Sequence, residues 1–225
     1  MFADQTWLAR IIWVLLALFM LDALFQRNWP LAFVAFATLL LSLTPVFAAR
    51  WAQITVPPSF IAAIVVFIGG TLFLGEVFDF YNRFWWWDLV MHGGSAIGFG
   101  LIGFVLVYMM FQGDRYAAPP IAVAFFAFCF ALAIGAMWEI FEFAMDQIFG
   151  LNMQKSGLMD TMWDLIMDFV GALIGAGSGY FYLRGRAKGG LMGLIDDFVR
   201  RNPRFFRRHR DKHSDGQSDS HRDGR

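Results

Sequence analysis

The stretch from Asp160 to Gly179, D-T-M-W-D-L-I-M-D-F-V-G-A-L-I-G-A-G-S-G, decides how this chain folds. Aspartate recurs at every fourth position of its first half, and glycine recurs at the same interval in its second half. On an α-helix these positions form one stripe, and nearly all the others are apolar. A helix that is apolar almost all round is either buried or spans a membrane. We therefore predict a transmembrane helix with an acidic half and a glycine half.

The two halves of this helix need different surroundings. A carboxylate that faces lipid costs several kcal/mol, so the acidic half should face protein or water. Small residues at every fourth position allow a neighbouring helix to approach closely. We predict that Gly171, Gly175 and Gly179 pack against such a helix, and that the last three spans of the chain form one packed unit.

The composition indicates a polytopic membrane protein. Of the 225 residues 58% are hydrophobic, and the mean hydropathy is +0.54. Apolar runs of about twenty residues, the length that crosses a bilayer, recur along the chain. The predicted spans cover residues 7–25, 30–49, 59–78, 88–111, 119–144 and 160–183. We therefore expect an all-α fold, a polytopic membrane helical bundle of about six transmembrane helices, and exclude an ordinary soluble domain.

Charge divides the chain into an acidic body and a basic tail. Residues 1–183 carry 6 Lys and Arg against 12 Asp and Glu, whereas residues 184–225 carry 12 against 6. Basic flanks mark the cytoplasmic side of a membrane protein, so we expect the C-terminus in the cytoplasm. An even number of spans then places the N-terminus there too. With this topology, the acidic ends of the third to sixth spans point outward.

We predict three parts along the chain. Two N-terminal transmembrane helices occupy residues 1–58, and a core four-helix unit over 59–183 carries the acidic cluster. The basic cytoplasmic tail is 184–225. Residues 189–210 mix apolar side chains with Arg, which suits a helix lying on anionic lipid, with a solvated basic segment as the alternative. Residues 211–225 are rich in Ser, Asp and Gly, and we expect them to be disordered.

The outward ends of four spans carry nine carboxylates and one imidazole. They are Glu76, Asp79, Asp88, His92, Glu139, Glu142, Asp146, Asp160, Asp164 and Asp168. Only Arg83 and Lys155 lie nearby in the sequence to offset this charge. Crowded carboxylates repel one another in a partly dry space. Some must therefore be protonated, or the two cations must fold in, or a divalent cation must bind.

Two residue pairs in this cluster have the spacing of metal ligands on one helix face. Asp88 and His92 are four residues apart, and Glu139 and Glu142 are three apart. In helical bundles, such pairs on facing helices build metal sites. A set rich in oxygen suits Mg²⁺, Mn²⁺ or Ca²⁺, with Zn²⁺ or iron as alternatives. We predict His92, Glu139, Glu142 and Asp164 as the metal ligands.

Asp88 and Asp168 are the candidate catalytic residues of the cluster. Either could orient His92 or serve as a general base. Each role has a structural alternative. His92 would then be a hydrogen-bonded core histidine, and the two glutamates would belong to a polar network. Asp79, Asp146 and Asp160 would be solvated loop acids.

Three motifs in order resemble the YjdF-like family of bacterial inner-membrane proteins. They are Trp87-Asp88-x-x-x-His92, Trp138-Glu139-x-x-Glu142, and Asp160-Thr161-x-Trp163-Asp164 followed by Gly171-Ala172-x-x-Gly175-Ala176. The resemblance covers about residues 60–183, and the layout is also similar to VanZ-like proteins. It implies a multi-span bundle in the bacterial inner (plasma) membrane, with polar residues in one membrane half, and it brings no established reaction. The VanZ-like relatives are linked to glycopeptide-antibiotic resistance, and this part of the resemblance implies cell-envelope lipids or precursors.

Three functions fit these observations. The first is a metal-dependent enzyme that acts on a lipid or cell-envelope substrate from the outer side. The second is a transport protein that binds cations or protons, although no polar track crosses the membrane. The third is a structural membrane scaffold without catalysis. We expect membrane lipids as partners, anionic-lipid contact by the basic tail, and no nucleic acid.

Overall fold

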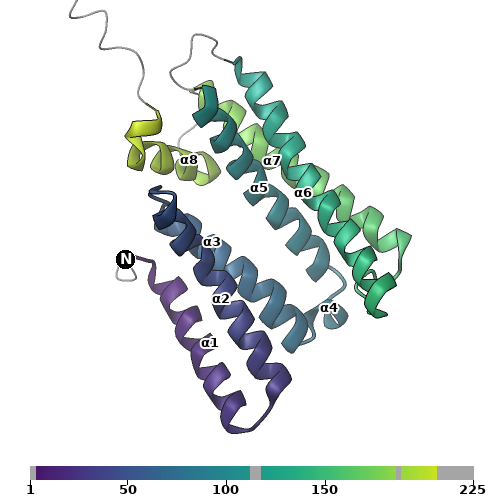
Figure 1. Cartoon of the computed structure of the whole chain (residues 1–225). Coiled ribbons are helices and arrows are strands. Elements are labelled where there is room, and N and C mark those ends of the chain that lie inside the picture. The colour runs from purple at the N-terminus through teal and green to yellow at the C-terminus, as the bar shows by residue number, and fades with distance from the viewer. Residues whose placement is uncertain (1–3, 112–117, 186–188, 207–225) are drawn as a thin grey trace, which may run out of the picture.

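The computed structural model describes residues 4–111, 118–185 and 189–206, and over these residues the chain is helical without strands (Figure 1). Its elements are α1 (Trp7–Phe25), α2 (Trp29–Trp51), α3 (Pro58–Ile68), η1 (Gly69–Val77), α4 (Phe80–Arg83), α5 (Trp87–Phe111), α6 (Pro120–Phe149), α7 (Leu158–Leu183), α8 (Gly190–Arg201) and η2 (Pro203–Phe205). Among the described residues, six helices are long and apolar enough to cross a membrane, with α3 and η1 together forming one of them. The predicted all-α membrane bundle is confirmed.

Local sequence signals set the ends of several spans. The side chain of Thr6 caps the first turn of α1 and that of Asn28 caps α2, each by accepting a backbone N–H. Pro120 opens α6, where the missing N–H of proline does no harm. α6 runs to Phe149, beyond the predicted end at 144, and stops where Gly150 adopts a left-handed φ of 66°.

The third span differs from the uniform α-helix that its apolar sequence predicts. Over η1 it widens into a π-helix. Gly75 in η1 lies directly under the ring of Tyr81, where a Cβ would overlap that ring. The chain then turns through α4 toward α5. Glycine at this point therefore allows Tyr81 to pack onto the span.

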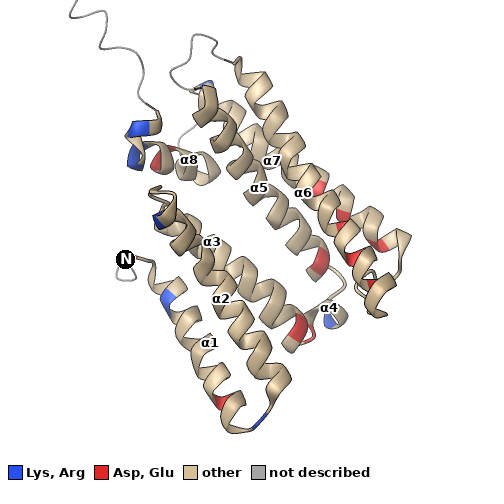
Figure 2. Cartoon of the chain, viewed as in Figure 1, with Lys and Arg blue, Asp and Glu red and all other residues tan. Residues whose placement is uncertain are grey.

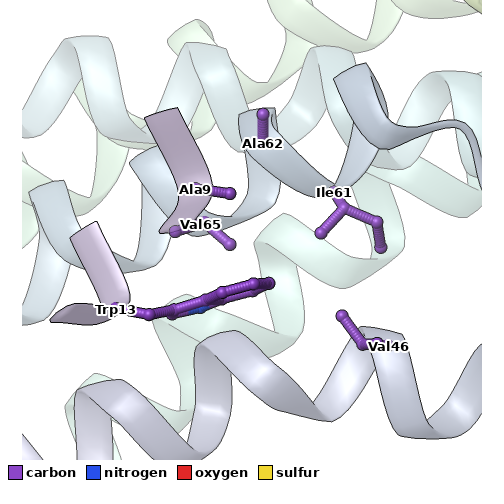
Figure 3. Close-up of a cluster of buried hydrophobic side chains, with 6 residues drawn as sticks. All are labelled: Ala9, Trp13, Val46, Ile61, Ala62 and Val65. Atoms are coloured by element: carbon purple, nitrogen blue, oxygen red, sulfur yellow. The ribbon is translucent and has the colours of Figure 1, made fainter. Parts of the chain in front are cut away.

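The helices form two packed groups (Figure 1). In the first group α1, α2 and the α3–η1 span surround Trp13, whose ring lies between Val46 and Val65 (Figure 3). The indole Nε1 of Trp13 donates to Ser42 Oγ at 3.1 Å, so this buried polar atom has a partner. The second group is α5, α6 and α7. The third span packs mainly with the first two, and the predicted three-part division of the chain stays a prediction.

The glycine half of α7 lies against α5. A Cβ at Gly175 would come 3.0 Å from the Cα of Gly100 on α5. A Cβ at Gly171 would overlap a backbone carbonyl of α5, and one at Gly179 would overlap the ring of Phe104. The two helices therefore touch through their backbones. This confirms the prediction that the glycines pack against a neighbouring helix within a unit of the last three spans.

α8 is the helix predicted in the basic tail, but its apolar side faces protein. Ile195 is 2% exposed and packs with Leu101 and Ala176 of the second group. After α8, the Asn202 side chain donates to the carbonyl of Thr55 and accepts from its N–H, both at 2.8 Å. This segment therefore joins the two helix groups. The predicted disordered residues 211–225 lie outside the described residues.

Candidate metal centre

Most of the acidic residues lie at one end of the second helix group (Figure 2). This end comprises the first turns of α5, the last turns of α6 and the first turns of α7. The structure brings together here all six residues predicted as metal ligands or catalytic residues. They are Asp88, His92, Glu139, Glu142, Asp164 and Asp168. Five of the six are buried, and Asp88 is partly exposed. Together they form the acidic site.

His92 lies at the centre of the acidic site. Its Nδ1 is 3.4 Å from Asp168 Oδ2 on α7. Its Nε2 is 3.8 Å from Glu139 Oε1 on α6 and 3.9 Å from Asp88 Oδ1 on its own helix. One imidazole, 7% exposed, therefore links carboxylates from all three helices.

Three side chains of the site are close enough to share one ion. Asp88, His92 and Asp164 each offer one ligand atom, and these atoms all lie within 4.8 Å of one another. Ligands bound to one ion at about 2.0–2.5 Å stand at most about 5 Å apart. This set contains Asp88, predicted from the sequence as catalytic, together with two of the predicted ligands. The metal-binding roles of Glu139 and Glu142 stay predictions.

Three buried carboxylate oxygens of the site lack a hydrogen-bond donor among the described residues. They are both oxygens of Glu139 and Oδ1 of Asp168, although Thr161 on α7 also interacts with Glu139 from beyond normal hydrogen-bond distance. Glu139 is 4% exposed and Asp168 is fully buried. A buried carboxylate oxygen without a donor is destabilising, and within the described part of the chain His92 is the one cationic group that contacts both carboxylates. The site is therefore short of positive charge or of protons.

Asp168 fits into a space that glycine creates on α6. A Cβ at Gly135 would overlap the Asp168 carboxylate, so only glycine leaves room for it there. From this position Asp168 contacts His92 Nδ1, which leaves His92 Nε2 turned toward Asp88 and Glu139. A carboxylate on one ring nitrogen orients the other nitrogen toward a metal. Gly135 was not predicted from the sequence, although it lies one helical turn before Glu139.

Glu142 occupies the edge of the site. Its Oε1 accepts a hydrogen bond of 2.9 Å from Nε1 of Trp138, one turn earlier on α6. It also interacts electrostatically with Glu139 and His92. Unlike Glu139, this carboxylate therefore has a donor. The motif Trp138-Glu139-x-x-Glu142 thus provides one satisfied carboxylate and one unsatisfied carboxylate.

Residues 150–157, which we call the strap, connect α6 to α7 over the acidic site. Asp146 folds the strap by accepting hydrogen bonds from the N–H of Met153 at 2.7 Å and of Gln154 at 3.0 Å. Lys155 follows directly, and its Nζ lies 2.6 Å from Asp88 Oδ2. Folding-in of the two cations was one of the three alternatives that the sequence left open, and Lys155 does fold into the cluster. Asp146, predicted as a candidate loop acid, instead has a clear structural role.

Tyr81 completes the surroundings of Lys155. The Lys155 ammonium lies 4.7 Å from the centroid of the Tyr81 ring, close enough for a cation–π interaction. Burial, together with the nearby negative charge of Asp88, holds the pKa of the Tyr81 phenol well above its usual range. Tyr81 is therefore neutral at physiological pH.

Comparison with known proteins agrees with the membrane fold. Residues 6–185 match the family described as "Predicted membrane protein (DUF2238)". YjdF-like proteins fall in this family, so the resemblance carried by the three motifs is confirmed. A Thermotoga maritima protein described as "Uncharacterized protein" is 30% identical over 102 residues, which is 44% of this chain. The chain spans about half the length of this curated relative (50%), and no solved structure matches.

Proposed function

We propose that this chain, which belongs to the DUF2238 family of predicted membrane proteins, is an enzyme that binds a divalent cation in the acidic site and uses that cation in catalysis. One observation carries the proposal. Glu139 is 4% exposed, both of its oxygens lack a hydrogen-bond partner among the described residues, and Oε1 points at His92 from 3.8 Å. A cation beside it would supply the missing charge.

Asp88, His92 and Asp164 would hold the ion, and Glu139 would be the fourth ligand. Two of the three close ligands are carboxylates and one is an imidazole, which suits Mn²⁺ or Mg²⁺ and also allows Zn²⁺. Asp168 would act as a positioning residue, because it fixes the ring of His92 through Nδ1.

A lipid or a lipid-linked cell-envelope molecule is the substrate class that the location favours. The site lies at the ends of three spans, and Trp85 and Trp86, which precede Asp88 by three and two residues, are 82% and 40% exposed. Exposed tryptophans at the ends of spans are typical of the membrane interface. A lipid headgroup at that depth could reach the site while its chains stay in the bilayer. The ion would supply Lewis-acid activation of a headgroup oxygen or of a water.

We infer that the acidic site faces outward in a bacterial inner membrane, with both termini in the cytoplasm. The last turns of α2 and α8 carry Arg50, Arg200 and Arg201, at the end of the molecule opposite most of the acids (Figure 2). Basic residues favour the cytoplasmic side. A cysteine replacing Asn152 should react with an impermeant thiol reagent in intact cells, whereas one replacing Arg200 should not. The reverse labelling would place the site on the cytoplasmic side.

A structural scaffold is the second candidate, and the Lys155–Asp88 ion pair favours it. This pair, at 2.6 Å, already neutralises one carboxylate of the cluster. If His92 and Lys155 together balanced the site, no ion would be needed. The Glu139 oxygens without a donor argue against this balance.

Metal content separates these candidates. The full chain would be purified in mild detergent, equilibrated with Mn²⁺, Mg²⁺ or Zn²⁺, freed of unbound ions and analysed for elements. We expect a stoichiometric ion that is lost in Glu139→Gln and in Asp164→Asn. It should remain in Asp22→Asn, which changes an acid of α1 outside the site. Failure of the folded wild-type chain to retain any of these ions would leave the scaffold as the function.

The enzymatic part of the proposal needs its own measurement. The ion-loaded chain would be incubated with a total lipid extract of bacterial membranes, and the lipids compared by mass spectrometry. Glu139→Gln and the chelator-treated wild type are the matched controls. A lipid that changes only with the loaded wild type supports an enzyme. An unchanged lipid profile with a firmly bound ion would reduce the proposal to cation binding.

A further inference from the structure

We propose that Lys155 is a tethered cation that competes with the bound ion for Asp88, and so sets the cation affinity of the acidic site. The inference rests on the proposed function, because it concerns regulation of the same site. Its structural basis is the strap, which holds one ammonium group against one of the ion's candidate ligands.

The strap is built to hold Lys155 in place. It begins at Gly150 and ends at Gly157, which have left-handed φ values of 66° and 65° that glycine adopts without strain. Asp146 accepts the N–H groups of the two residues before Lys155. Gln154 Nε2 also donates to Thr161 Oγ1 at 2.7 Å, which fastens the strap to α7. The backbone directly before Lys155 is therefore fixed.

The Lys155 ammonium itself is held less firmly than its backbone. It contacts Asp88 Oδ2 and the face of the Tyr81 ring, and its side chain is 31% exposed. A partly exposed ion pair contributes little net stability. Lys155 can therefore leave Asp88 for solvent without exposing any buried charge of its own.

Asp88 cannot serve both cations equally well. Its Oδ1 faces His92 Nε2 inside the site, while its Oδ2 faces Lys155. A divalent ion shared by Asp88, His92 and Asp164 would lie close to the ammonium, and the two positive charges would repel each other. By thermodynamic linkage, Lys155 weakens ion binding by the same factor by which the ion weakens the Lys155–Asp88 pair. A monovalent ion brings no more charge than the ammonium it displaces, so the strap favours divalent ions.

Mn²⁺ affinity tests this competition directly. Free Mn²⁺ would be measured by electron paramagnetic resonance during titration of the full chain in detergent. Lys155→Gln removes the charge, and Lys155→Arg is the matched control that keeps it. We expect Lys155→Gln to bind Mn²⁺ about fivefold more tightly than the wild type, and Lys155→Arg to bind it no more tightly than the wild type.

The outcomes distinguish this inference from the proposed function. Equal Mn²⁺ affinities of the wild type and Lys155→Gln would overturn the role of Lys155 and leave the metal site standing. If only Lys155→Gln bound Mn²⁺, Lys155 would prevent Mn²⁺ binding in the wild type, which supports the competition. No Mn²⁺ binding by any of the chains would overturn the metal site and this inference with it.

Discussion

The two halves of α7 carry one stripe at one spacing, yet they meet their neighbours in opposite ways. In the glycine half, the backbones of α7 and α5 touch at Gly175 and Gly100. In the acidic half, side chains fill the space between the helices, with Asp168 reaching to Gly135 on α6 and to His92 on α5. The glycine half is therefore held by close packing, which needs no ligand. The acidic half collects negative charge that its own residues only partly balance.

This contrast gives the two halves different tasks. Gly171 lies three residues after Asp168, so the backbone contact with α5 begins directly below the acidic site. Rigid elements position functional groups more accurately than loops do. We infer that the glycine half sets the distances between the carboxylates, and that stability of the acidic half depends on what it binds.

The largest expected effect is in the glycine half. Gly175→Leu would force apart two backbones in contact, and we expect it to destabilise the chain by more than about 4 kcal/mol or to prevent folding. Leu173→Phe is the control, because the Leu173 side chain on the same helix is 50% exposed. It should lower the free energy of unfolding by less than about 1 kcal/mol. Thermal unfolding in detergent measures both. Similar tolerance of the two changes would break the comparison, because the glycines would then not be holding the unit.

The next effect belongs to the acidic half and depends on the ion. Mn²⁺ at about a hundred times its Kd should stabilise the wild type by about 2.7 kcal/mol, because the ion binds only the folded chain. Glu139→Gln should lose most of this gain. Without Mn²⁺ the same variant should be at least as stable as the wild type, since it removes a buried charge that lacks a donor. Thermal unfolding with and without Mn²⁺ measures both effects. If Mn²⁺ left the unfolding temperature of the wild type unchanged, stability of the acidic half would not depend on a bound ion.

A smaller effect is expected where the acidic half meets α6. Gly135→Ala places a methyl group on the Asp168 carboxylate, and overpacking of this kind costs about 1–3 kcal/mol. Gly177→Ala is the matched control, because a Cβ at Gly177 meets nothing within 4 Å. Combining Gly135→Ala with Asp168→Ala should recover part of the loss, as expected for two residues in contact. Additive losses in the double variant would show that Gly135 does not accommodate Asp168.

Much of this arrangement could be predicted from the sequence, because its signals are local. The six spans follow from hydropathy. The glycine contact follows from the four-residue spacing of glycines along a single helix. Asp88 and His92 share a helix face, so their proximity needs no tertiary information. The amphipathic pattern of α8 was also visible, but such a pattern does not tell lipid from protein as its partner. Ile195 in fact packs into the second helix group.

The missed features depend on contacts between distant or unremarkable residues. Gly135 is one glycine in an apolar helix, and only the fold brings Asp168 against it. Asp146 binds backbone N–H groups seven and eight residues further on, and these carry no side-chain signature. Lys155 and Asp88 are 67 residues apart in the chain. Charge balance gave folding-in of Lys155 only as one of three alternatives, and it could not indicate which carboxylate Lys155 would meet.

The smallest expected effect concerns the strap, which belongs to the acidic half alone. Asp146→Asn keeps one acceptor oxygen but loses the negative charge that two backbone N–H groups share, so we expect a loss of about 1 kcal/mol in stability. The sharper measurement is local, because a cysteine replacing Asn152 should react faster with maleimide in this variant. Contacts in the glycine half should be unaffected, so a cysteine replacing Ser178 on α7 should keep its rate in the same detergent. A uniform increase at both positions would mean that Asp146 stabilises the whole helix group rather than the strap, and that the two halves of α7 are less independent than their packing indicates.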